Sequence, residues 1–552
     1  MATHSAAAVA TSASSWAKRK ADFKPAYANA PAIASTFNPS AQQQSFFEWI
    51  AFGDGSLILE ACAGSGKTTT LVEGVSRMQG RVFFGAYNKK IADELQKRVP
   101  QSFNVKVATM HSAGYAALKQ IAPNATLDYN KMRDIYRGIA GYDKQLKGLE
   151  ALILDLVSFA KQAAIGIVCS IDDKDAWFEV ADQFGMDLSG EEDVILFNAI
   201  KTLKRSNELC LTAIDFEDMI YYPLLMKAVN AQYDWVLVDE AQDTNATRRL
   251  LALALLKKNG RMVAVGDRSQ AIYAFTGADH NSLDLIQSYT SASLMPLSVS
   301  YRCPKAVVAE AKKYAHHIEA HEDAPEGIVR YASMSNIFDE VKKGDAVLCR
   351  YNAPLVELAY YLILKGMPAK IEGKDIGANL KSLAKKWKSP ATLYDFKKKL
   401  NEYCVKSVNK FVADKKEYLA EALKDKVSCL EIVIDRLLMK GSKGNPSELL
   451  VTEIDAIFGE TINGDSSTYI LLSSIHKAKG LEFKKVIWLT NKPGKRKLKD
   501  WEISSETNLK YVAITRAMYE LVMIPLPDKT KPNPEASSPL AVAAHDIFEG
   551  DE

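Results

Sequence analysis

The stretch Leu57-Ile-Leu-Glu-Ala-Cys-Ala-Gly-Ser-Gly-Lys-Thr-Thr-Thr70 decides the fold class of this chain. It begins with an apolar run typical of a buried parallel strand, continues through a glycine-rich turn, and ends in residues that can start a helix. A turn of this kind between a strand and a helix is where backbone N–H groups bind phosphate. The order of strand, turn and helix therefore predicts an α/β domain with a phosphate-binding loop.

The residues of this loop have the chemistry that a triphosphate needs. Gly64 and Gly66 allow backbone N–H groups to curl around phosphate oxygens. Lys67 can neutralise the β- and γ-phosphates, and the Thr68 hydroxyl can bind Mg²⁺. A chance glycine-rich turn would not explain why strand, loop, lysine, threonine and helix coincide. The nucleotide-binding residues that we expect in the loop are Ala63, Gly64, Ser65, Gly66, Lys67, Thr68 and Thr69, with Ala61 in place of the usual first glycine.

A second apolar run, Trp235-Val-Leu-Val-Asp-Glu-Ala-Gln-Asp243, ends in carboxylates. A buried strand here would place them at the carboxyl edge of the sheet, where open α/β sheets bind ligands. Asp239 can complete the coordination of Mg²⁺, and Glu240 can orient or deprotonate an attacking water. Alone, these residues could also cap a helix. Together with the phosphate loop they predict hydrolysis of a nucleoside triphosphate.

Short runs of apolar and β-branched residues recur in two series between helical stretches. The first series is 57–61, 82–86, 105–109, 235–238 and 262–265, and the second is 328–331, 346–349, 469–473, 486–489 and 521–524. Strands that alternate with helices indicate doubly wound α/β sheets. Each series is interrupted by a long segment with helical character, which predicts two α/β domains, each with a mostly helical insertion.

Composition limits the class of protein. The 552 residues are too many for one hydrophobic core, and 47% hydrophobic and 25% charged residues are ordinary globular values. We find no apolar stretch of about 18 residues, the length needed to cross a bilayer. The seven cysteines form no C-x-x-C pair, which favours a reducing compartment without disulfides or structural zinc.

The charge of the chain is unevenly distributed. The formal net charge of +3 does not by itself indicate nucleic-acid binding. Residues 381–426, however, hold 13 lysines against 6 acids, a local balance of 13 − 6 = +7. A solvated helical face and a phosphate-contacting surface are both consistent with this pattern.

Further motifs occur in a fixed order: Val265-Gly-Asp-Arg-Ser-Gln-Ala-Ile-Tyr-Ala-Phe-Thr-Gly-Ala278, Ser300-Tyr-Arg302, Ser474-Ile-His-Lys-Ala-Lys-Gly-Leu-Glu-Phe483 and Tyr511-Val-Ala-Ile-Thr-Arg-Ala517. With the phosphate loop and the acidic run, they make the chain resemble a superfamily 1 helicase of the UvrD/Rep type over nearly all of residues 38–526. Asp215-Phe-Glu-Asp-Met-Ile220 also resembles an intermediate motif of that family. A match to several ordered motifs is much more specific than a lone phosphate loop.

The resemblance implies roles around the nucleotide. Gln270 would sense the γ-phosphate, and Arg302 and Arg516 would reach it from the second domain, where they could stabilise transition-state charge. For each arginine taken alone, a surface salt bridge would be the favoured interpretation. Tyr301 would stack on adenine, although core packing is an alternative for its ring. Adenine would be read by Gln42 or by Gln43, with Gln42 the better candidate, and the ribose side of the site would include Gly480 and Glu482.

The resemblance also implies a track for single-stranded DNA. Its residues would be Tyr87, Asn88, Lys89, Thr109, His111, Phe275, His476 and Lys477. Aromatic rings can stack on bases without demanding a sequence, which a translocating motor requires. Phe275-Thr276 stands where the family commonly has a Trp-Arg pair, so one polar contact is missing there, and Phe275 could instead be a core residue.

In this reading the fold class is α/β, with two RecA-like P-loop NTPase domains. The first would comprise residues 37–117 and 211–292 with a helical insertion at 118–210, and the second residues 293–374 and 463–530 with a short lysine-rich insertion at 375–462. Residues 1–36, rich in Ala and Ser, would form a disordered tail, and residues 531–552 a C-terminal tail.

The expected activity is that of an ATP-dependent DNA helicase with ATP and Mg²⁺ as cofactors, moving 3′ to 5′ on single-stranded DNA and unwinding duplex DNA. We expect a monomer without membrane contact, in the cytoplasm or nucleoid, or in the nucleus if the gene is eukaryotic. A rival within enzymes is a helicase of the other superfamily 1 branch or an RNA-directed one, which the segment Gln270-Ala-Ile-Tyr-Ala-Phe275 argues against. The rival from a different class is a DNA-binding scaffold that uses ATP only as a conformational switch. Intact Glu240, Arg302 and Arg516 argue against that rival.

Overall fold

The computed structural model describes residues 37–99, 104–184, 186, 188, 190–273, 277–279, 281–372, 374–387, 390–413, 417–458, 468–491 and 500–527. Both predicted tails, 1–36 and 531–552, therefore lie outside the described residues. The chain divides into two compact units, Met1–Val299 and Ser300–Glu552. Each unit contains one large parallel sheet, so the predicted α/β class with two sheets is confirmed.

The sheet of the first unit has six strands, and every pair of neighbours is parallel. Across the sheet the order is β3 (Val105–Thr109), β2 (Val82–Ala86), β6 (Tyr233–Val238), β7 (Leu256–Gly266), β1 (Leu57–Ala61) and β8 (Ser293–Leu297). Because all strands run the same way, their carboxyl ends lie along one edge. The loops that follow β1, β2, β3, β6 and β7 therefore meet there.

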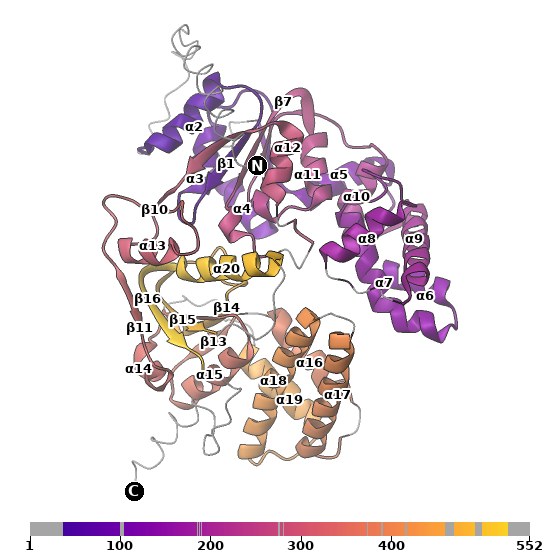
Figure 1. The fold of residues 1–552 in the computed structure, drawn as a ribbon, viewed down its shortest axis with the longest axis vertical. Coiled ribbons are helices and arrows are strands. Elements are labelled where there is room, and N and C mark those ends of the chain that lie inside the picture. The colour runs from indigo at the N-terminus through magenta and orange to yellow at the C-terminus, as the bar shows by residue number, and fades with distance from the viewer. Residues whose placement is uncertain are drawn as a thin grey trace. The chain divides into compact units, whose positions relative to one another are not determined.

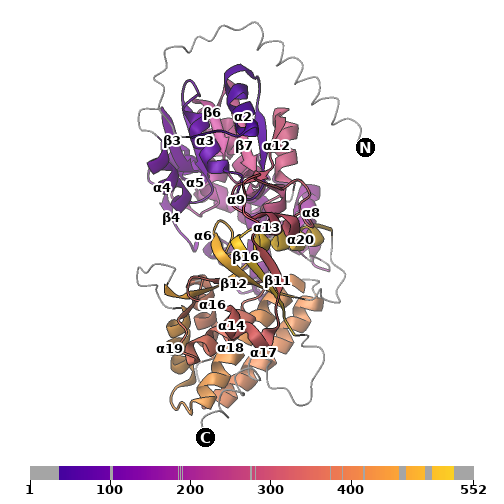
Figure 2. The same cartoon turned by 90° about the vertical axis from the view of Figure 1, so that its left-hand side faces the viewer.

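Helices cover both faces of this sheet (Figure 2). Alternate residues of a strand point to opposite faces, so Leu57 and Leu59 join one core while Ile58 joins the other. The first core includes α2 (Ala41–Phe52), α3 (Lys67–Val75) and α4 (Lys89–Arg98). The second includes α5 (Met110–Ile121), α10 (Asp218–Leu225), α11 (Ala246–Ala254) and α12 (Ser282–Thr290).

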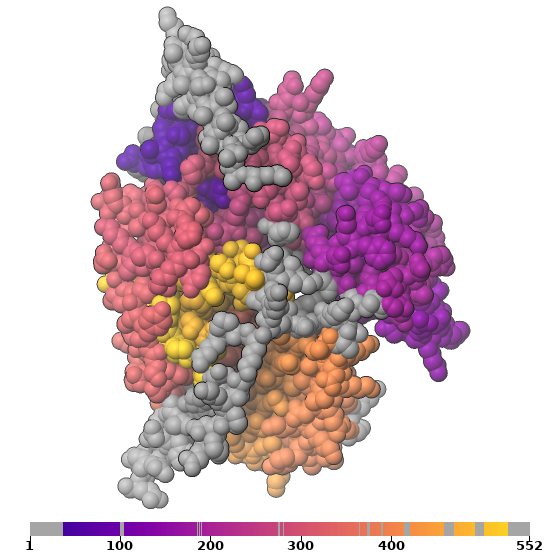
Figure 3. All heavy atoms as spheres, in the orientation of Figure 1, coloured from indigo at the N-terminus to yellow at the C-terminus, as the bar shows by residue number. Residues whose placement is uncertain are grey.

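The first insertion is helical, and in the space-filling view its described side chains form a continuous purple lobe (Figure 3). Its helices are α6 (Lys131–Ala140), α7 (Lys144–Gln162), α8 (Lys174–Gln183) and α9 (Glu192–Leu209). Tyr136, Ile153 and Trp177 lie in its core. The short strands β4 (Thr126–Leu127) and β5 (Ala213–Ile214) pair in parallel and bring the two ends of the insertion together.

A buried ion cluster lies where this insertion joins the first unit. Lys161 contacts the carboxylates of Asp215 and Asp218, and Lys131 Nζ lies 2.6 Å from Asp218 Oδ2. Burial alone would lower the pKa of Lys161, but the two carboxylates raise it above its ordinary value. Since an unpaired charge in this position would be strongly unfavourable, the cluster holds residues 215–218 in one geometry.

The second unit has a parallel sheet of its own (Figure 1). The order is β11 (Ile328–Tyr331), β16 (Ala517–Pro525), β15 (Phe483–Thr490), β12 (Ala346–Cys349), β14 (Ile470–Ser474) and β13 (Ala369–Ile371). Helices α13 (Lys305–Ala311) and α20 (Asp500–Ile514) lie on one face, and α14 (Ile337–Glu340) and α15 (Ala353–Leu364) on the other.

The second insertion follows β13 and precedes β14. It consists of α16 (Lys374–Ala384), α17 (Leu393–Ala413), α18 (Glu417–Met439) and α19 (Pro446–Phe458). Some of its lysines are used within the fold, since Lys381 and Lys397 pair with Asp455 and Asp435. Others, such as Lys398, are exposed on α17. The described lysines therefore include both structural and free surface charges.

Among the described helices of the whole chain, none is both long enough and apolar enough to traverse a bilayer.

All ten predicted strand runs coincide with strands, but one strand of each six-stranded sheet and the strands of the two-stranded sheets were not predicted. The segment Ser293–Leu297, which we assigned to the second domain, forms β8 and pairs with β1 in the first sheet. Along the chain, the boundary between the compact units lies between Val299 and Ser300 and not at residue 293. Both strands missed in the large sheets, β8 and β13, lie at a sheet edge. An edge strand pairs with a neighbouring strand on one side only, so it does not require the long apolar run of a central strand.

We predict that Gly114→Ala destabilises the first unit by about 1–3 kcal/mol. A Cβ at Gly114 of α5 would lie 2.4 Å from the backbone oxygen of Met219 in α10, so the two helices would have to separate. Urea denaturation measures the loss. The matched control is Gly138→Ala in α6, where a Cβ meets nothing within 4 Å, and which should be neutral or stabilise by up to about 1 kcal/mol. Equal effects of the two changes would contradict the close packing of α5 on α10.

Candidate functional site

The phosphate-binding loop follows β1 at the carboxyl edge of the first sheet. Gly64 and Gly66 have φ values of 74° and 77°, a left-handed conformation that other residues adopt at a cost. The Ser65 hydroxyl donates to the Cys62 carbonyl at 2.9 Å, which closes the turn. Lys67 Nζ donates to the Ala61 carbonyl at 3.4 Å. The ammonium group of Lys67 therefore contacts a neutral carbonyl, and a negatively charged phosphate would bind it more strongly than this carbonyl does.

The two candidate glutamines differ in their surroundings. Gln42 is partly buried, and its amide makes two hydrogen bonds to Ser298 at 2.9 Å each. Gln43 is buried, accepts the Ser40 N–H and donates to Thr70 of α3 at 2.9 Å. Gln43 is therefore hydrogen-bonded to α3, the helix that follows the phosphate loop. Gln42 is hydrogen-bonded to Ser298, directly after β8. This geometry leaves the choice between them open.

Acidic and amide side chains form a network after β6 and β7. Asp239 is buried directly after β6, and its Oδ1 accepts the N–H of Glu240 at 3.0 Å. The Gln242 amide donates to the Glu240 carboxylate, while its Oε1 accepts the Asp267 N–H at 3.1 Å. Gln270 Nε2 donates to Asp267 Oδ2 at 2.8 Å. The network thus connects the predicted residues Glu240 and Gln270.

We did not single out Gln242 or Asp267 from the sequence, although both lie inside quoted motifs. Their role depends on Gly266, where a Cβ would lie 2.4 Å from Gln242 Oε1. The glycine of the pair Gly266-Asp267 was the available signal. The sequence does not show that Gly266 makes room for the Gln242 side chain, because Gln242 comes from the loop after a different strand, β6.

The oxygen donors near the phosphate loop suit Mg²⁺. Thr68 offers a hydroxyl and Asp239 a carboxylate, and Mg²⁺ is usually held by one or two such oxygens together with phosphate and water. Asp239 and the loop follow β6 and β1, which flank β7 in the same sheet. The residues present therefore fit a magnesium–triphosphate complex.

Candidate DNA-binding residues follow the neighbouring strands β2 and β3. Tyr87 stacks on Tyr273 with ring centroids 6.0 Å apart, and the Arg248 guanidinium lies 6.0 Å from the Tyr87 ring. Burial and the nearby Asp243 raise the pKa of Tyr87 to about 12. Asn88 and Thr109 cap α4 and α5, and Lys89 is exposed. Phe275 and Thr276 lie outside the described residues.

His111 stacks on Phe216, with ring centroids 4.0 Å apart. Burial, with a contribution from Arg248, lowers the pKa of His111 to about 3, so its ring is neutral near pH 7. Phe216 is 48% exposed although the buried ion cluster holds both sides of its backbone. Sequence reasoning did not identify Phe216 or Arg248. The sequence signal for Phe216 was its position as an aromatic residue between acidic residues, in Asp215-Phe-Glu-Asp218.

The second unit carries the remaining predicted residues. Tyr301 is 47% exposed, and Arg302 Nε lies 2.6 Å from Glu482 Oε2. Arg516 is buried, with its guanidinium donating to the carbonyls of Val512 and Leu481 and to the Thr515 hydroxyl at 3.1–3.2 Å. Gly480 has a φ of 84° in the same turn as Glu482.

His476 and Lys477 follow β14. Burial, with Arg350 and Lys479 nearby, lowers the pKa of His476 to about 3. Lys477 is exposed, and its N–H donates to the Ser474 hydroxyl at 3.4 Å. The histidine is therefore a neutral ring beside an exposed lysine.

Comparison with known proteins gives two family matches. Residues 41–290 match the UvrD/REP helicase N-terminal domain, and residues 381–526 match the UvrD-like helicase C-terminal domain. The matches cover the phosphate loop, the acidic network and the segments of His476, Glu482 and Arg516.

Curated relatives agree with this assignment. The chain is 25% identical over 307 residues to the ATP-dependent DNA helicase PcrA of Bacillus subtilis, covering 51% of this chain and 39% of the relative. It is 26% identical over 289 residues to DNA helicase II of Rickettsia typhi, covering 47% and 42%. It is 25% identical over 298 residues to the ATP-dependent DNA helicase Rep of Escherichia coli, covering 50% and 42%.

The aligned region spans only about two fifths of the length of these relatives. The family itself is supported independently by the two domain matches, by the parallel sheets and by the ordered motifs at their carboxyl edges. This chain belongs to the UvrD/Rep family of superfamily 1 helicases.

Proposed function

We propose that this protein is an ATP-driven DNA helicase that moves along single-stranded DNA and unwinds duplex DNA. The observation that carries the proposal is the hydrogen-bonded chain from Glu240 through Gln242 and Asp267 to Gln270, at the same sheet edge as the phosphate loop. The names of the relatives, which are ATP-dependent DNA helicases, support it.

In this proposal each residue at the nucleotide has a physical task. Lys67 and the loop N–H groups bind the β- and γ-phosphates, and Thr68 and Asp239 hold Mg²⁺, which neutralises charge on the phosphates. Glu240 orients the attacking water, because phosphoryl transfer depends mainly on positioning and electrostatics. Gln270 contacts the γ-phosphate. Arg302 and Arg516 add positive charge from the second unit, and Tyr301, Gly480 and Glu482 bind the nucleoside with Gln42 or Gln43.

The DNA track that we propose lies next to the hydrolytic carboxylates. The charges of Glu240 and Asp243 both contribute to raising the pKa of Tyr87 and of Tyr273. The aromatic pair is therefore close enough to respond electrostatically to the nucleotide network. Gln270 and Tyr273 also lie three residues apart on one segment. If Gln270 shifts when the γ-phosphate is lost, the Tyr273 ring on the same segment would move, and with it the proposed contact to a DNA base.

The same edge extends to Thr109 and His111, and the stacked ring of Phe216 adds a further aromatic surface. Each base stacked on an aromatic ring contributes about 1–3 kcal/mol without sequence preference. Asn88, Lys89 and Lys477 would contact phosphates, with a strength that falls as salt rises. His476 would add a neutral ring from the second unit. Phe275 remains part of the proposed track through its place in the motif.

The Lys67→Ala variant should lose ATP hydrolysis while still binding single-stranded DNA, because the change removes charge at the phosphates and leaves the aromatic rings in place. DNA-stimulated ATPase rates and fluorescence anisotropy with a labelled oligonucleotide measure the two properties. Lys89→Ala is the matched control, since it should weaken DNA binding and keep Mg²⁺–ATP binding. Equal ATPase rates for Lys67→Ala and the parent protein would refute the role of the loop.

Direction can be tested with partial duplexes. We expect displacement of a strand from a 3′-tailed substrate and little displacement from a 5′-tailed one, as movement from 3′ to 5′ on the loading strand requires. A gel-based strand-displacement assay with ATP checks this. Replacing the DNA tail by RNA tests the choice of nucleic acid. Preferential unwinding of 5′-tailed DNA would reject the proposed direction.

Affinity for single-stranded DNA should stay constant between about pH 5.5 and pH 8 at fixed salt. His111 and His476 have pKa values of about 3, so both rings are neutral throughout this range. A histidine with an ordinary pKa would gain a proton as the pH fell through about 6.5, and would then bind phosphate more tightly. Anisotropy titrations at several pH values measure the affinity. Tighter binding at low pH that disappears in His111→Gln would show that His111 acts as a cation.

A further inference from the structure

Tyr301 follows the short strand β9 (Val299–Ser300), which pairs with β10 (Glu319–Ala320). The N–H of His321, the residue after β10, donates to the Ser300 carbonyl at 3.1 Å. The residues that follow the two strands are thereby brought together. The rings of Tyr301 and His321 lie with their centroids 4.9 Å apart and their planes tilted by 38°. This separation is within the range of favourable aromatic pairs.

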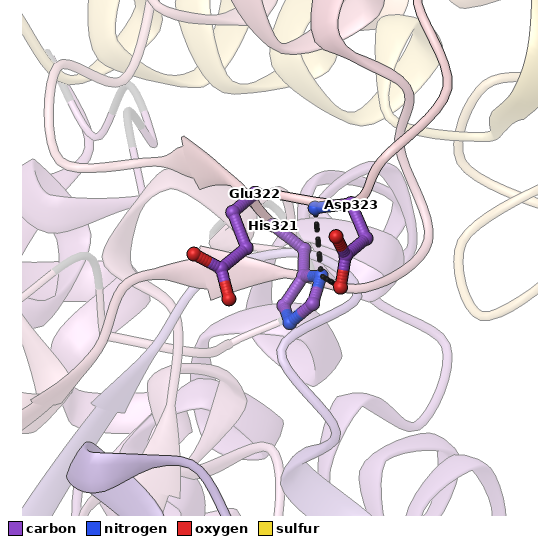
Figure 4. A group of neighbouring side chains, drawn as sticks. All are labelled: His321, Glu322 and Asp323. Atoms are coloured by element: carbon purple, nitrogen blue, oxygen red, sulfur yellow. Dashed lines mark hydrogen bonds and ion pairs between the residues drawn. The ribbon is translucent and has the colours of Figure 1, made fainter.

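The His321 ring is itself held in place. Its Nδ1 accepts the N–H of Asp323 at 3.2 Å, as the dashed lines in Figure 4 show, and its carbonyl accepts the N–H of Ala324 at 3.0 Å. The second dashed line marks the ion pair of this Nδ1 with Asp323 Oδ2, 3.9 Å away. Glu322 and Asp323 are exposed, and one lone pair of His321 is already used. We therefore assign no metal to these three neighbours.

Tyr301 has little else to define the orientation of its ring. The described part of the chain offers no hydrogen-bond partner to its hydroxyl, and 47% of the residue is exposed. The next residue, Arg302, is anchored by Glu482. The tyrosine backbone is thus fixed by its neighbours, while its ring depends on the contact with His321.

We propose that His321 is a positioning residue for Tyr301: it covers one face of the tyrosine ring and holds the other face ready for the nucleobase of the bound triphosphate. This inference rests on the proposed function, in which Tyr301 stacks on adenine. It extends that function by a residue outside the motifs quoted from the sequence. A ring that is oriented in advance loses less conformational freedom when the base binds.

The experiment measures equilibrium binding by isothermal titration calorimetry, without DNA and with Mg²⁺. Two ligands are compared: ATP, and inorganic tripolyphosphate, which has no base. The variants are His321→Ala, His321→Phe, Tyr301→Ala and the double alanine variant, with Glu322→Ala as the matched control in the same loop. Thermal unfolding of each variant monitors its folding.

His321→Ala should weaken ATP binding by about two- to tenfold, the range expected for loss of one aromatic pair. Tripolyphosphate binding should not change, and His321→Phe should restore ATP binding because it restores a ring. The double variant should bind ATP as Tyr301→Ala does, since His321 acts only through the tyrosine. Glu322→Ala should match the parent.

Three results would overturn the inference alone: unchanged ATP binding in His321→Ala, an equal loss for tripolyphosphate, or additive losses in the double variant. Additive losses would mean that His321 acts on the loop and not on the Tyr301 ring. If the parent protein binds neither ligand, the proposed function fails and this inference fails with it. If the parent protein and His321→Ala bind ATP equally well, the role of His321 is refuted and the proposed function stands.

Discussion

The contact between the Gln242 side chain and the backbone of Gly266-Asp267 is the constraint on which the candidate site depends. It joins the end of β6 to the end of β7, two adjacent strands whose loops carry Glu240 and Gln270, the residues that we propose orient water and contact the γ-phosphate. Only glycine at position 266 leaves room for the Gln242 amide. The amide uses both of its ends, one on Glu240 and one on Asp267. One side chain therefore links the two loops directly.

The proposed DNA surface is supported by packing that keeps the Phe216 ring 48% exposed. Phe216 follows Asp215, whose carboxylate contacts Lys161 in the buried ion cluster. Close approach of α5 and α10 at Gly114 then brings His111 against the exposed ring. Buried ion pairs contribute little net stability, but breaking one is costly, so they favour a single geometry. Such a support suits the proposed DNA surface, which would bind successive bases without changing shape.

The candidate DNA-binding residues of the two units include both neutral rings and exposed lysines. Burial keeps His111 and His476 uncharged, while Lys89 and Lys477 remain exposed. Stacking on a base requires an apolar face, and attraction to phosphate requires a solvated cation. By contrast, the lysine-rich second insertion mixes ion-paired and free lysines, so its composition alone does not define a function.

The sequence by itself determined the parallel sheets, the phosphate loop and the ordered motifs, because each depends on local signals. Buried parallel strands are continuous apolar runs, and a phosphate loop needs glycine, lysine and threonine at neighbouring positions. It did not reveal the edge strands β8 and β13, which lack such runs.

Only the tertiary structure decided that Gln242, Asp267, Phe216, Arg248 and His321 belong beside the predicted residues. Each is placed by a partner distant in sequence or on another element: Gln242 by Gly266, Phe216 by His111, and His321 by Tyr301. Residue type and spacing along the chain carry no information about such pairings. They arise when separate strands and helices pack, because only then do side chains from different loops meet.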